Sequence, residues 1–234
     1  MKEDLLFLLF FLHKKKIIKF LEIEDVKKLE QPIVDRTKDA IEHEKENKLT
    51  TTDKIVIRDF ALISLVYACA LRISEACELK LANLNLEEKI AYIEDSKGDD
   101  RVVPIPKPII PAIEKWLAVR PNWKGNKYVF TNVKGTTRPG INGNARPLNQ
   151  KYYNQLFDKM AEQTGVTLRD GSAPHPHTLR HSRAMELYDA NTDLEVLQAF
   201  LGHKNISTTQ VYAVVRDERV IEAQQNVVKG LVTI

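Results

Sequence analysis

The chain has 234 residues, of which 43% are hydrophobic and 29% are charged, and its formal net charge is +3. This composition excludes a disordered or fibrous protein and indicates a globular chain that can bury a sizeable core. Because the net charge is small, only the placement of the basic residues can point to nucleic acid. Cys69 and Cys77 form no C-x-x-C pair, so two partly buried thiols in a reducing cytosol are expected.

An apolar run from Leu5 to Leu12 opens the chain, and a basic stretch from His13 to Lys19 follows it. The run is shorter than the roughly 20 apolar residues that cross a bilayer. Acidic residues precede it and no small-residue cleavage site follows, which argues against a secretory signal. Residues 1–20 are therefore predicted to form a helix and a basic linker in a cytoplasmic protein. Three lysines are candidate DNA contacts, with a solvated charged face as the alternative: Lys14, Lys15 and Lys16.

Helical spacing dominates the next segment. Residues 24–48 are highly charged with a few apolar positions, and a strongly apolar helix is predicted from about Lys54 to Ala70. The cluster Thr51-Thr52-Asp53 in front of it is typical of an N-terminal cap. Arg72 follows the end of that helix, and a second helix is predicted from about Ser74 to Leu79.

Residues 84–106 change to β-type spacing. Apolar segments at 90–93 and 102–105 flank a polar turn that contains a glycine, which predicts a hairpin with Lys97 at its tip. A helix from Pro108 to about Arg120 and a short strand from Tyr128 to Thr131 are expected next.

A long loop over residues 132–149 is rich in Gly, Pro and Asn, and loops of this length are usually functional or mobile. Its basic residues are candidate DNA contacts: Lys134, Arg138 and Arg146. Four helices are predicted to follow: from Asn149 to Thr164 with Gly165 as its stop, then 178–188, 194–201, and 207 onward to the C-terminus.

Four short segments carry the chemistry. They are ALRISE at 70–75, the Lys97 turn, HTLRH at 177–181, and LGHKNISTTQVY at 201–212. One H-x-x-R alone would mean nothing, because such patterns arise by chance. In this order the four segments resemble the catalytic domain of the tyrosine recombinases, the phage integrase family, and the last is similar to Xer-type members. The resemblance implies a mostly helical α+β fold with a small antiparallel sheet, over residues 21–234.

Attack on a phosphodiester gathers negative charge on its non-bridging oxygens, which paired guanidinium donors can bind. Arg72 and Arg180 are the candidates, and His203 can add a further donor. Tyr212 is the candidate nucleophile, and its phenolate can form a bond that preserves the energy of cleavage for rejoining.

The resemblance assigns further roles. It implies that Lys97 protonates the leaving 5′ oxygen and that His177 assists proton transfer at the tyrosine. From its spacing, Glu75 is expected to orient the Arg72 guanidinium without touching the DNA. His181 is expected either to pack in the core or, like Glu75, to support the catalytic residues without being one. His177 and His181 have the spacing of a metal pair, but no further ligand stands beside them, so neither a metal nor another cofactor is expected.

Two departures from the family pattern stand out. Ala70 occupies a position where the family usually has glycine, a change expected to cost little. About twenty residues before Leu21 cannot fold into the usual N-terminal DNA-clamping domain, so the chain is either a fragment or a small member without the clamp.

The expected function is site-specific DNA recombination, by integration, excision or resolution, through a 3′-phosphotyrosine intermediate. Two alternatives stay open: a relaxing enzyme of the type IB topoisomerase kind, and a DNA-binding module that has lost catalysis. Beyond Tyr212, apolar residues recur every seven positions at Val214, Ile221 and Val228. The stripe by itself fits a helix that folds back on its own domain or one that docks on another chain. The resemblance implies the second: the C-terminal helix docks on a neighbouring protomer in a homo-oligomer on double-stranded DNA.

Overall fold

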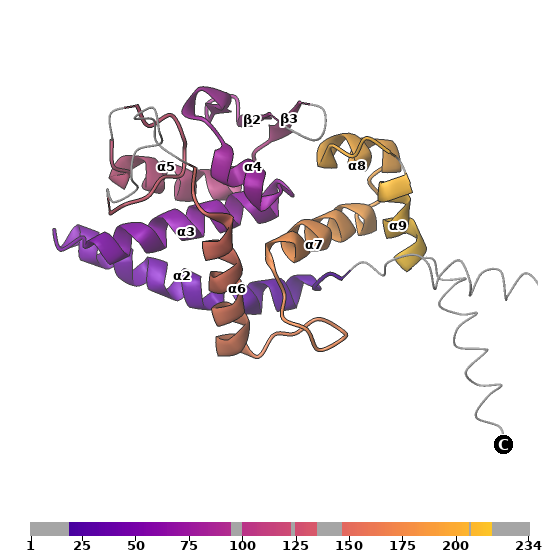
Figure 1. Cartoon of the computed structure of the whole chain (residues 1–234), viewed down its shortest axis with the longest axis horizontal. Helices are drawn as coiled ribbons and strands as arrows, with labels where there is room; N and C mark the ends of the chain where they lie inside the picture. Colours follow the sequence, from indigo (N-terminus) through magenta and orange to yellow (C-terminus); the bar gives the residue numbers. More distant parts are fainter. Residues whose placement is uncertain (1–18, 95–99, 123–124, 135–146, 206, 217–234) are drawn as a thin grey trace, which may run out of the picture.

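The computed structural model describes residues 19–94, 100–122, 125–134, 147–205 and 207–216, with only the backbone for 213–216. This part of the chain is mostly helical, and its small antiparallel sheet lies at the upper edge of the molecule in Figure 1. The sequence predicts this mixture of many helices and a small sheet. No helix among the described residues has both the length and the apolar character needed to cross a membrane. The predicted helix at Leu5 to Leu12 and the basic linker lie outside the described residues.

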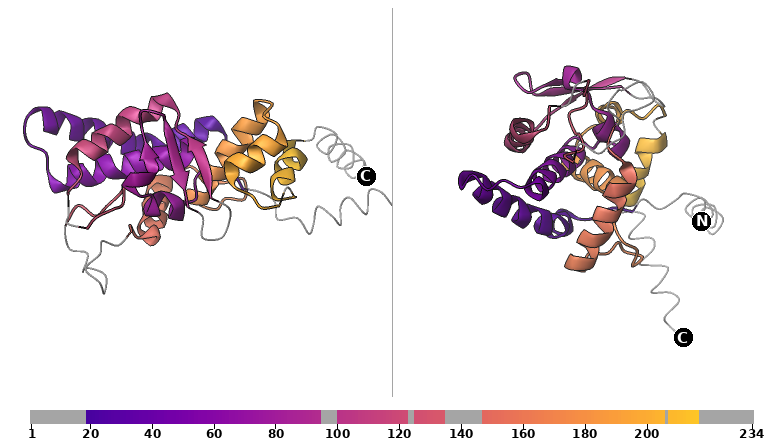
Figure 2. Two further views of the ribbon diagram at one scale, coloured as in Figure 1. Left: turned by 90° about the horizontal axis from the view of Figure 1, so that it is seen from above. Right: turned by 60° about the vertical axis from the view of Figure 1, so that its left-hand side comes forward.

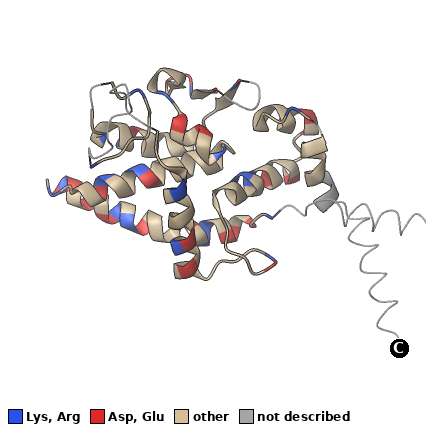
Figure 3. Ribbon diagram, viewed as in Figure 1, with Lys and Arg blue, Asp and Glu red and all other residues tan. Residues whose placement is uncertain are grey.

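Two long helices, α2 (Ile23–Lys45) and α3 (Thr51–Ala68), pack against each other and form one side of the molecule (Figure 1). α2 carries charges of both signs along its length (Figure 3) and buries a narrow apolar face against the core. The N-terminal cap of α3 is Thr50, just before the predicted cap cluster, and the helix starts at Thr51 where a start near Lys54 was predicted. The Thr50 hydroxyl accepts a hydrogen bond from the Asp53 N–H at 3.1 Å, and the Asp53 carboxylate accepts from the Thr50 N–H at 2.8 Å, so Thr51 already belongs to the helix.

Three short strands form the sheet in the order β1 (Leu84–Asn85), β2 (Ile90–Ile93) and β3 (Arg101–Pro104). β2 and β3 are antiparallel, with Ile93 opposite Arg101 and Tyr92 opposite Val102, which confirms the predicted hairpin. The sheet lies beside α4 (Ile73–Glu78) in Figure 1. Residues 95–99, with Lys97, lie outside the described part.

The predicted strand at 128–131 is wrong, because Tyr128 forms only an isolated bridge with Lys80. Its carbonyls bond to side chains instead of a strand partner: Trp116 Nε1 donates to the Val129 carbonyl at 2.8 Å, and Arg120 Nη2 donates to the Tyr128 carbonyl at 2.7 Å. Both donors come from the end of α5 (Ile110–Val119), which follows a 3-10 turn, η2 (Lys107–Ile109), where one helix from Pro108 was expected.

The remaining helices follow the predicted order. α6 (Gln150–Thr164) begins where the Asn149 side chain accepts from the Lys151 N–H at 2.9 Å, and it ends at Gly165 in the left-handed conformation, as predicted. α7 (Pro176–Asp189), α8 (Leu194–Leu201) and α9 (Ser207–Arg216) gather at one end of the molecule, away from the turn that joins α2 to α3 (Figures 1 and 2). They hold a second, smaller apolar cluster that includes Leu197, Leu201 and Tyr212.

A buried carboxylate ties α3 to α6. Asp59 is 2% exposed and accepts from Arg58 Nη2 at 2.7 Å, from the Tyr152 hydroxyl at 2.5 Å and from the Tyr153 hydroxyl at 3.1 Å. Arg58 also donates to the Thr131 carbonyl at 3.3 Å, so the cluster holds the chain after α5 as well. Removing one member leaves a buried charge without its partner, which is costly.

We expect Asp59→Ala to lower the free energy of unfolding by about 3–5 kcal/mol, because Arg58 would stay buried without a counterion. Urea denaturation measures the change. Asp35→Ala is the matched control, since Asp35 is an exposed carboxylate paired with Lys38, and it should cost less than about 0.5 kcal/mol. Equal losses in the two variants would contradict a structural role for the Asp59 cluster.

Candidate active site

The guanidinium group of Arg180 on α7 joins two turns that are far apart in the sequence. Its Nη1 donates to the Ala70 carbonyl at 2.8 Å, and its Nη2 donates to the Leu201 carbonyl. The side chain is 1% exposed, so these carbonyls replace the water that the charge has lost. One turn leads directly into Arg72, and the other leads through Gly202 into His203. Arg180 therefore brings together the segments that carry the other predicted site residues.

The turn before Arg72 corrects one expectation. Ala70 has φ of 48°, in the left-handed region that favours glycine. The position thus still requires a positive φ, and the alanine adopts it at a cost of roughly 1–2 kcal/mol. The expectation that replacing glycine costs little was therefore wrong. Contacts in the completed fold hold the strained residue, since the Ala70 side chain is fully buried and its carbonyl binds Arg180.

Glu75 holds Arg72 in place, as its position one helical turn away predicts. Arg72 Nη1 donates to Glu75 Oε1 at 2.7 Å, and the Arg72 N–H donates to Oε2 at 2.8 Å. The Arg72 side chain remains 32% exposed, whereas Glu75 is 4% exposed, so the arginine can reach a ligand from a fixed base. Burial by itself would raise the pKa of Glu75, but hydrogen bonds and positive charge from Arg101, followed by Arg180, lower it below its ordinary value.

Arg101 on β3 is a member of this group that the motifs did not single out. Its Nη1 and Nη2 donate to the two oxygens of Glu75 at 3.0 and 2.9 Å, and its Nε donates to the Phe200 carbonyl at 3.2 Å. A signal for it exists in the sequence. Strand residues alternate between faces, and the inward position of Val103 requires Arg101 to point inward as well. A charge at an inward strand position needs a buried partner.

Gly202 ends α8 in the left-handed conformation, with φ of 64°, and His203 follows it as predicted. A Cβ at Gly202 would lie 2.9 Å from Arg101 Cδ and 3.0 Å from Arg101 Nη1. The glycine is therefore required both by its φ and by the passage of the arginine. The His203 Nδ1 atom lies 3.0 Å from the Thr209 hydroxyl, which leaves Nε2 available for a ligand.

Tyr212 lies on α9 and is fully buried in the smaller apolar cluster. Its hydroxyl lies 3.0 Å from Nδ1 of His181, which sequence reasoning had treated as a packing residue. His177, the expected helper, is exposed and packs edge-on against His181, with ring centroids 4.5 Å apart. The hydrogen-bond partner described for the Tyr212 hydroxyl is thus the second histidine of HTLRH. The i, i+4 spacing of the two histidines contained this possibility, because both lie on one face of α7.

Burial and nearby arginines keep the histidines of the site neutral at pH 7. Burial lowers the pKa of His181 to about 3 and that of His203 to about 4, and positive neighbours add to both effects. Partial burial and then Arg180 lower the pKa of His177 to about 4. Burial raises the pKa of Tyr212 to about 12, only partly opposed by Arg180. The tyrosine is therefore protonated, and the positive charge of the site comes from arginine.

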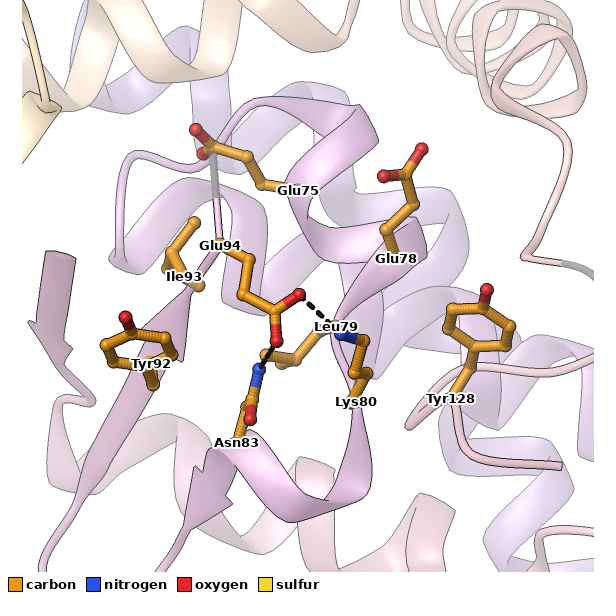
Figure 4. Close-up of a pocket in the computed structure, with 9 residues that line it drawn as sticks. All are labelled: Glu75, Glu78, Leu79, Lys80, Asn83, Tyr92, Ile93, Glu94 and Tyr128. Atoms are coloured by element: carbon orange, nitrogen blue, oxygen red, sulfur yellow. Dashed lines mark hydrogen bonds and ion pairs between the residues drawn. The ribbon is translucent and has the colours of Figure 1, made fainter. Parts of the chain in front are cut away.

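A polar pocket of about 230 Å³ lies beside Glu75 and the β2 residues Tyr92, Ile93 and Glu94 (Figure 4). Glu94 accepts from Asn83 at 2.8 Å and from Lys80 in its wall. Internal pairs thus occupy these three side chains, and Lys134, the predicted DNA contact that lies within the described residues, does not line the pocket.

The predicted DNA contacts are mostly beyond the described residues. Lys134 is exposed, and its N–H donates to the Asn132 side chain at 3.1 Å. The other predicted contacts lie outside the described residues and remain predictions: Lys14, Lys15, Lys16, Arg138 and Arg146. The same holds for Lys97, the predicted acid.

A family comparison agrees with this arrangement. Residues 39–219 match the model of the phage integrase family. The chain belongs to this family, and its fold is that of a tyrosine recombinase catalytic domain. Among its relatives are the tyrosine recombinases XerC and XerA, so within the family it is Xer-like.

Three relatives define the extent of the likeness. Tyrosine recombinase XerC of Corynebacterium glutamicum is 31% identical over 76% of this chain and 53% of that protein. XerC of Thermodesulfovibrio yellowstonii is 32% identical over 89% and 62%, and XerA of Pyrococcus furiosus is 28% identical over 89% and 70%. This chain therefore spans roughly half to two thirds of the length of most of these relatives.

Solved structures share the fold. A XerH site-specific recombinase bound to its palindromic difH substrate has a TM-score of 0.66 at 25% identity, and covers 89% of this chain and 53% of that one. A lambda integrase dimer bound to a core site has a TM-score of 0.59 at 17% identity, with 85% and 60% covered.

We expect Gly202→Ala to destabilise the protein by at least about 1 kcal/mol more than Gly165→Ala. Both glycines end a helix with similar positive φ, of 64° and 66°, so both variants carry the roughly 1–2 kcal/mol of left-handed strain. Only Gly202 would press a methyl group into Arg101, because nothing lies within 4 Å of a Cβ at Gly165. Urea unfolding measures both, and equal losses would mean that Arg101 moves aside freely.

Proposed function

We propose that this chain breaks and rejoins DNA at specific sites, with Tyr212 as the nucleophile. Its oxygen attacks the phosphorus, the bond to the 5′ oxygen breaks, and the DNA is held as a 3′-phosphotyrosine until the 5′ hydroxyl returns. The observation that carries the proposal is that Arg180 binds the turns leading to Arg72 and His203, and lies close enough to Tyr212 to act on its pKa. We propose that one phosphate contacts all four residues once α9 has moved and exposed Tyr212.

The proposed roles follow from charge and exposure. The Arg72 guanidinium is partly exposed and is held in place by Glu75. Arg180 supplies a second positive charge from its buried position beneath the site. Donors held ready for a developing oxyanion are worth about 10²–10³ in rate each. His203 is neutral and its Nδ1 is next to Thr209, so Nε2 can donate a third hydrogen bond to the phosphate. Lys97 remains the proposed acid for the leaving 5′ oxygen.

We propose that His181, rather than His177, accepts the proton of the tyrosine. The phenol has a raised pKa and does not ionise spontaneously near pH 7, so attack needs an acceptor. His181 is neutral at this pH and lies within hydrogen-bond distance of the hydroxyl. The buried tyrosine must also become accessible to a phosphate, so DNA binding is expected to move α9.

The relatives support a DNA substrate and site-specific recombination over relaxation alone. The XerH structure is described as a site-specific recombinase on difH, and the lambda integrase as a dimer on a core site. For the present chain we propose double-stranded DNA sites as substrate, assembly of several protomers through the segment after Tyr212, and a cytoplasmic location. Basic residues of the 132–149 loop and of the N-terminal linker are the proposed DNA contacts, and the catalytic unit is proposed to run from residue 21.

We expect Tyr212→Phe to abolish covalent attachment to DNA while the dissociation constant for DNA changes by less than about threefold. Only the attacking oxygen is lost, and binding rests mainly on phosphate contacts. A nicked suicide substrate followed by denaturing electrophoresis measures the adduct, and a gel shift measures binding. Tyr188→Phe, on the α7 side of the same cluster, is the matched control and should form adduct normally. An adduct with the Tyr212 variant would refute the proposed nucleophile.

We expect His181→Gln to slow cleavage by about 10²-fold at pH 7, the low end of what a positioned base contributes. Its rate should then rise about tenfold per pH unit, because the phenolate fraction grows in that way below its pKa. The wild-type rate should stay nearly flat. The charged or titratable groups facing His181 are His175, His177, Arg180, His203 and Tyr212.

Single-turnover cleavage across about pH 6 to 9 tests this expectation. His175→Gln is the control for the same chemical change on the exposed residue that precedes α7, and it should remain within about threefold of wild type. If His177→Gln acquires the steep pH dependence and His181→Gln does not, the proton goes to His177.

A further inference from the structure

Arg101 is fully occupied by partners inside the protein. Its three nitrogens donate to Glu75 Oε1, to Glu75 Oε2 and to the Phe200 carbonyl, at 3.0, 2.9 and 3.2 Å. Its side chain is 7% exposed. Because each of its nitrogens bonds inside the protein and its side chain is almost completely buried, Arg101 does not offer its guanidinium to a DNA phosphate. Any effect of Arg101 on the reaction must therefore pass through the groups that it touches.

Glu75 creates an electrostatic problem that Arg101 can solve. The carboxylate pairs with Arg72 at 2.7 Å and lies 3.7 Å from Arg180 Nη1, so it orients both proposed phosphate-binding groups. The same negative charge competes with the phosphate for both arginines. A buried carboxylate shared by two arginines would cancel half of their charge, and this loss is large because burial weakens solvent screening.

We propose that Arg101 is a positioning residue that serves as the dedicated counterion of Glu75 and leaves the full charge of Arg72 and Arg180 available to the scissile phosphate. The bidentate geometry supports this assignment, because paired donors to both carboxylate oxygens are the strongest form of such a contact. Arg72 Nη1 donates to Glu75 Oε1, and Arg180 Nη1 lies farther away, at 3.7 Å from Oε2. The inference rests on the proposed DNA-cleaving function.

The third bond of Arg101 extends the role to the other side of the site. The Phe200 carbonyl belongs to the last turn of α8, two residues before Gly202, and Gly202 lies against the Arg101 side chain. Arg101 thus spans from Glu75 on α4 to the turn that presents His203. Moving the strand that bears Arg101 would shift both sides of the phosphate site together.

The test compares Arg101→Met, which removes the charge and keeps bulk, with Arg101→Lys, which keeps the charge but cannot make all three bonds. Single-turnover cleavage by Arg101→Met should fall at least tenfold with DNA affinity changed less than about threefold, and Arg101→Lys should lie between it and wild type. Arg120→Met is the matched control, because Arg120 also binds carbonyls inside the protein but is outside this group. It should cleave at a rate close to wild type.

Two further readouts separate positioning from mere stability. In a Glu75→Gln background, Arg101→Met should lower the cleavage rate by less than about a further twofold, because the carboxylate that Arg101 neutralises is already gone. The protein without DNA provides the second readout: in Arg101→Met the Glu75 carboxyl, followed by carbon NMR, should titrate at a higher pH than in wild type. Without Arg101, burial raises the pKa of Glu75. Cleavage by the variant should therefore be lost as the pH falls through this raised pKa. The groups facing Glu75 are Arg72, Arg101, His177 and Arg180.

Each result has a definite meaning. Wild-type cleavage by a folded Arg101→Met, or fully multiplicative losses in the double variant, would overturn the inference. Should Arg101→Met fail to fold, both measurements are made on Arg101→Lys. An unchanged Glu75 titration or a wild-type cleavage rate in that variant would overturn the inference. Failure of the proposed function looks different: wild type itself would form no covalent adduct, while the shift of the Glu75 titration would still decide whether Arg101 is its counterion.

Discussion

The buried guanidinium of Arg180 is the constraint on which the site depends. A charge that is almost completely removed from water must be surrounded by acceptors, and here they are the Ala70 and Leu201 carbonyls and the nearby Glu75 carboxylate. Each carbonyl lies at the start of a turn that presents a functional side chain, Arg72 in one case and His203 in the other. The need to solvate one cation therefore brings three distant segments together.

The same desolvation determines which groups carry charge. Buried among arginines, His181 and His203 stay neutral near pH 7, and Tyr212 stays protonated. Positive potential therefore comes from guanidinium groups, which burial does not readily deprotonate, while the imidazoles can accept or donate single protons. Fixed charges in a medium of low polarity stabilise an oxyanion more strongly than the same charges in water. The division between charge carriers and proton carriers follows from burial alone.

The order of helices, the hairpin and the main motif residues could be predicted from periodicity, capping and spacing. Asn149 and Gly165 mark the ends of α6 because each has one dominant conformational use. That residues 128–131 form no strand could not be predicted, since their carbonyls bond to Trp116 and Arg120 from another element. The partner of Tyr212 was missed for a similar reason: spacing places His177 and His181 on one face, but only the docking of α9 decides which ring meets the hydroxyl.

The order in which the site residues follow one another along the chain has a consequence for protein synthesis. Arg72 emerges from the ribosome well before Arg180, and Tyr212 follows only after α7 and α8 have been made. Ala70 in its strained conformation and Arg180 in its buried position stabilise each other, so neither half is well formed without the other. A nascent chain that has completed only α2 to α6 lacks Arg180, His203 and Tyr212, and so lacks most of the proposed site. Under the proposed function, cleavage of DNA therefore becomes possible only after α7, α8 and α9 have been made and have docked.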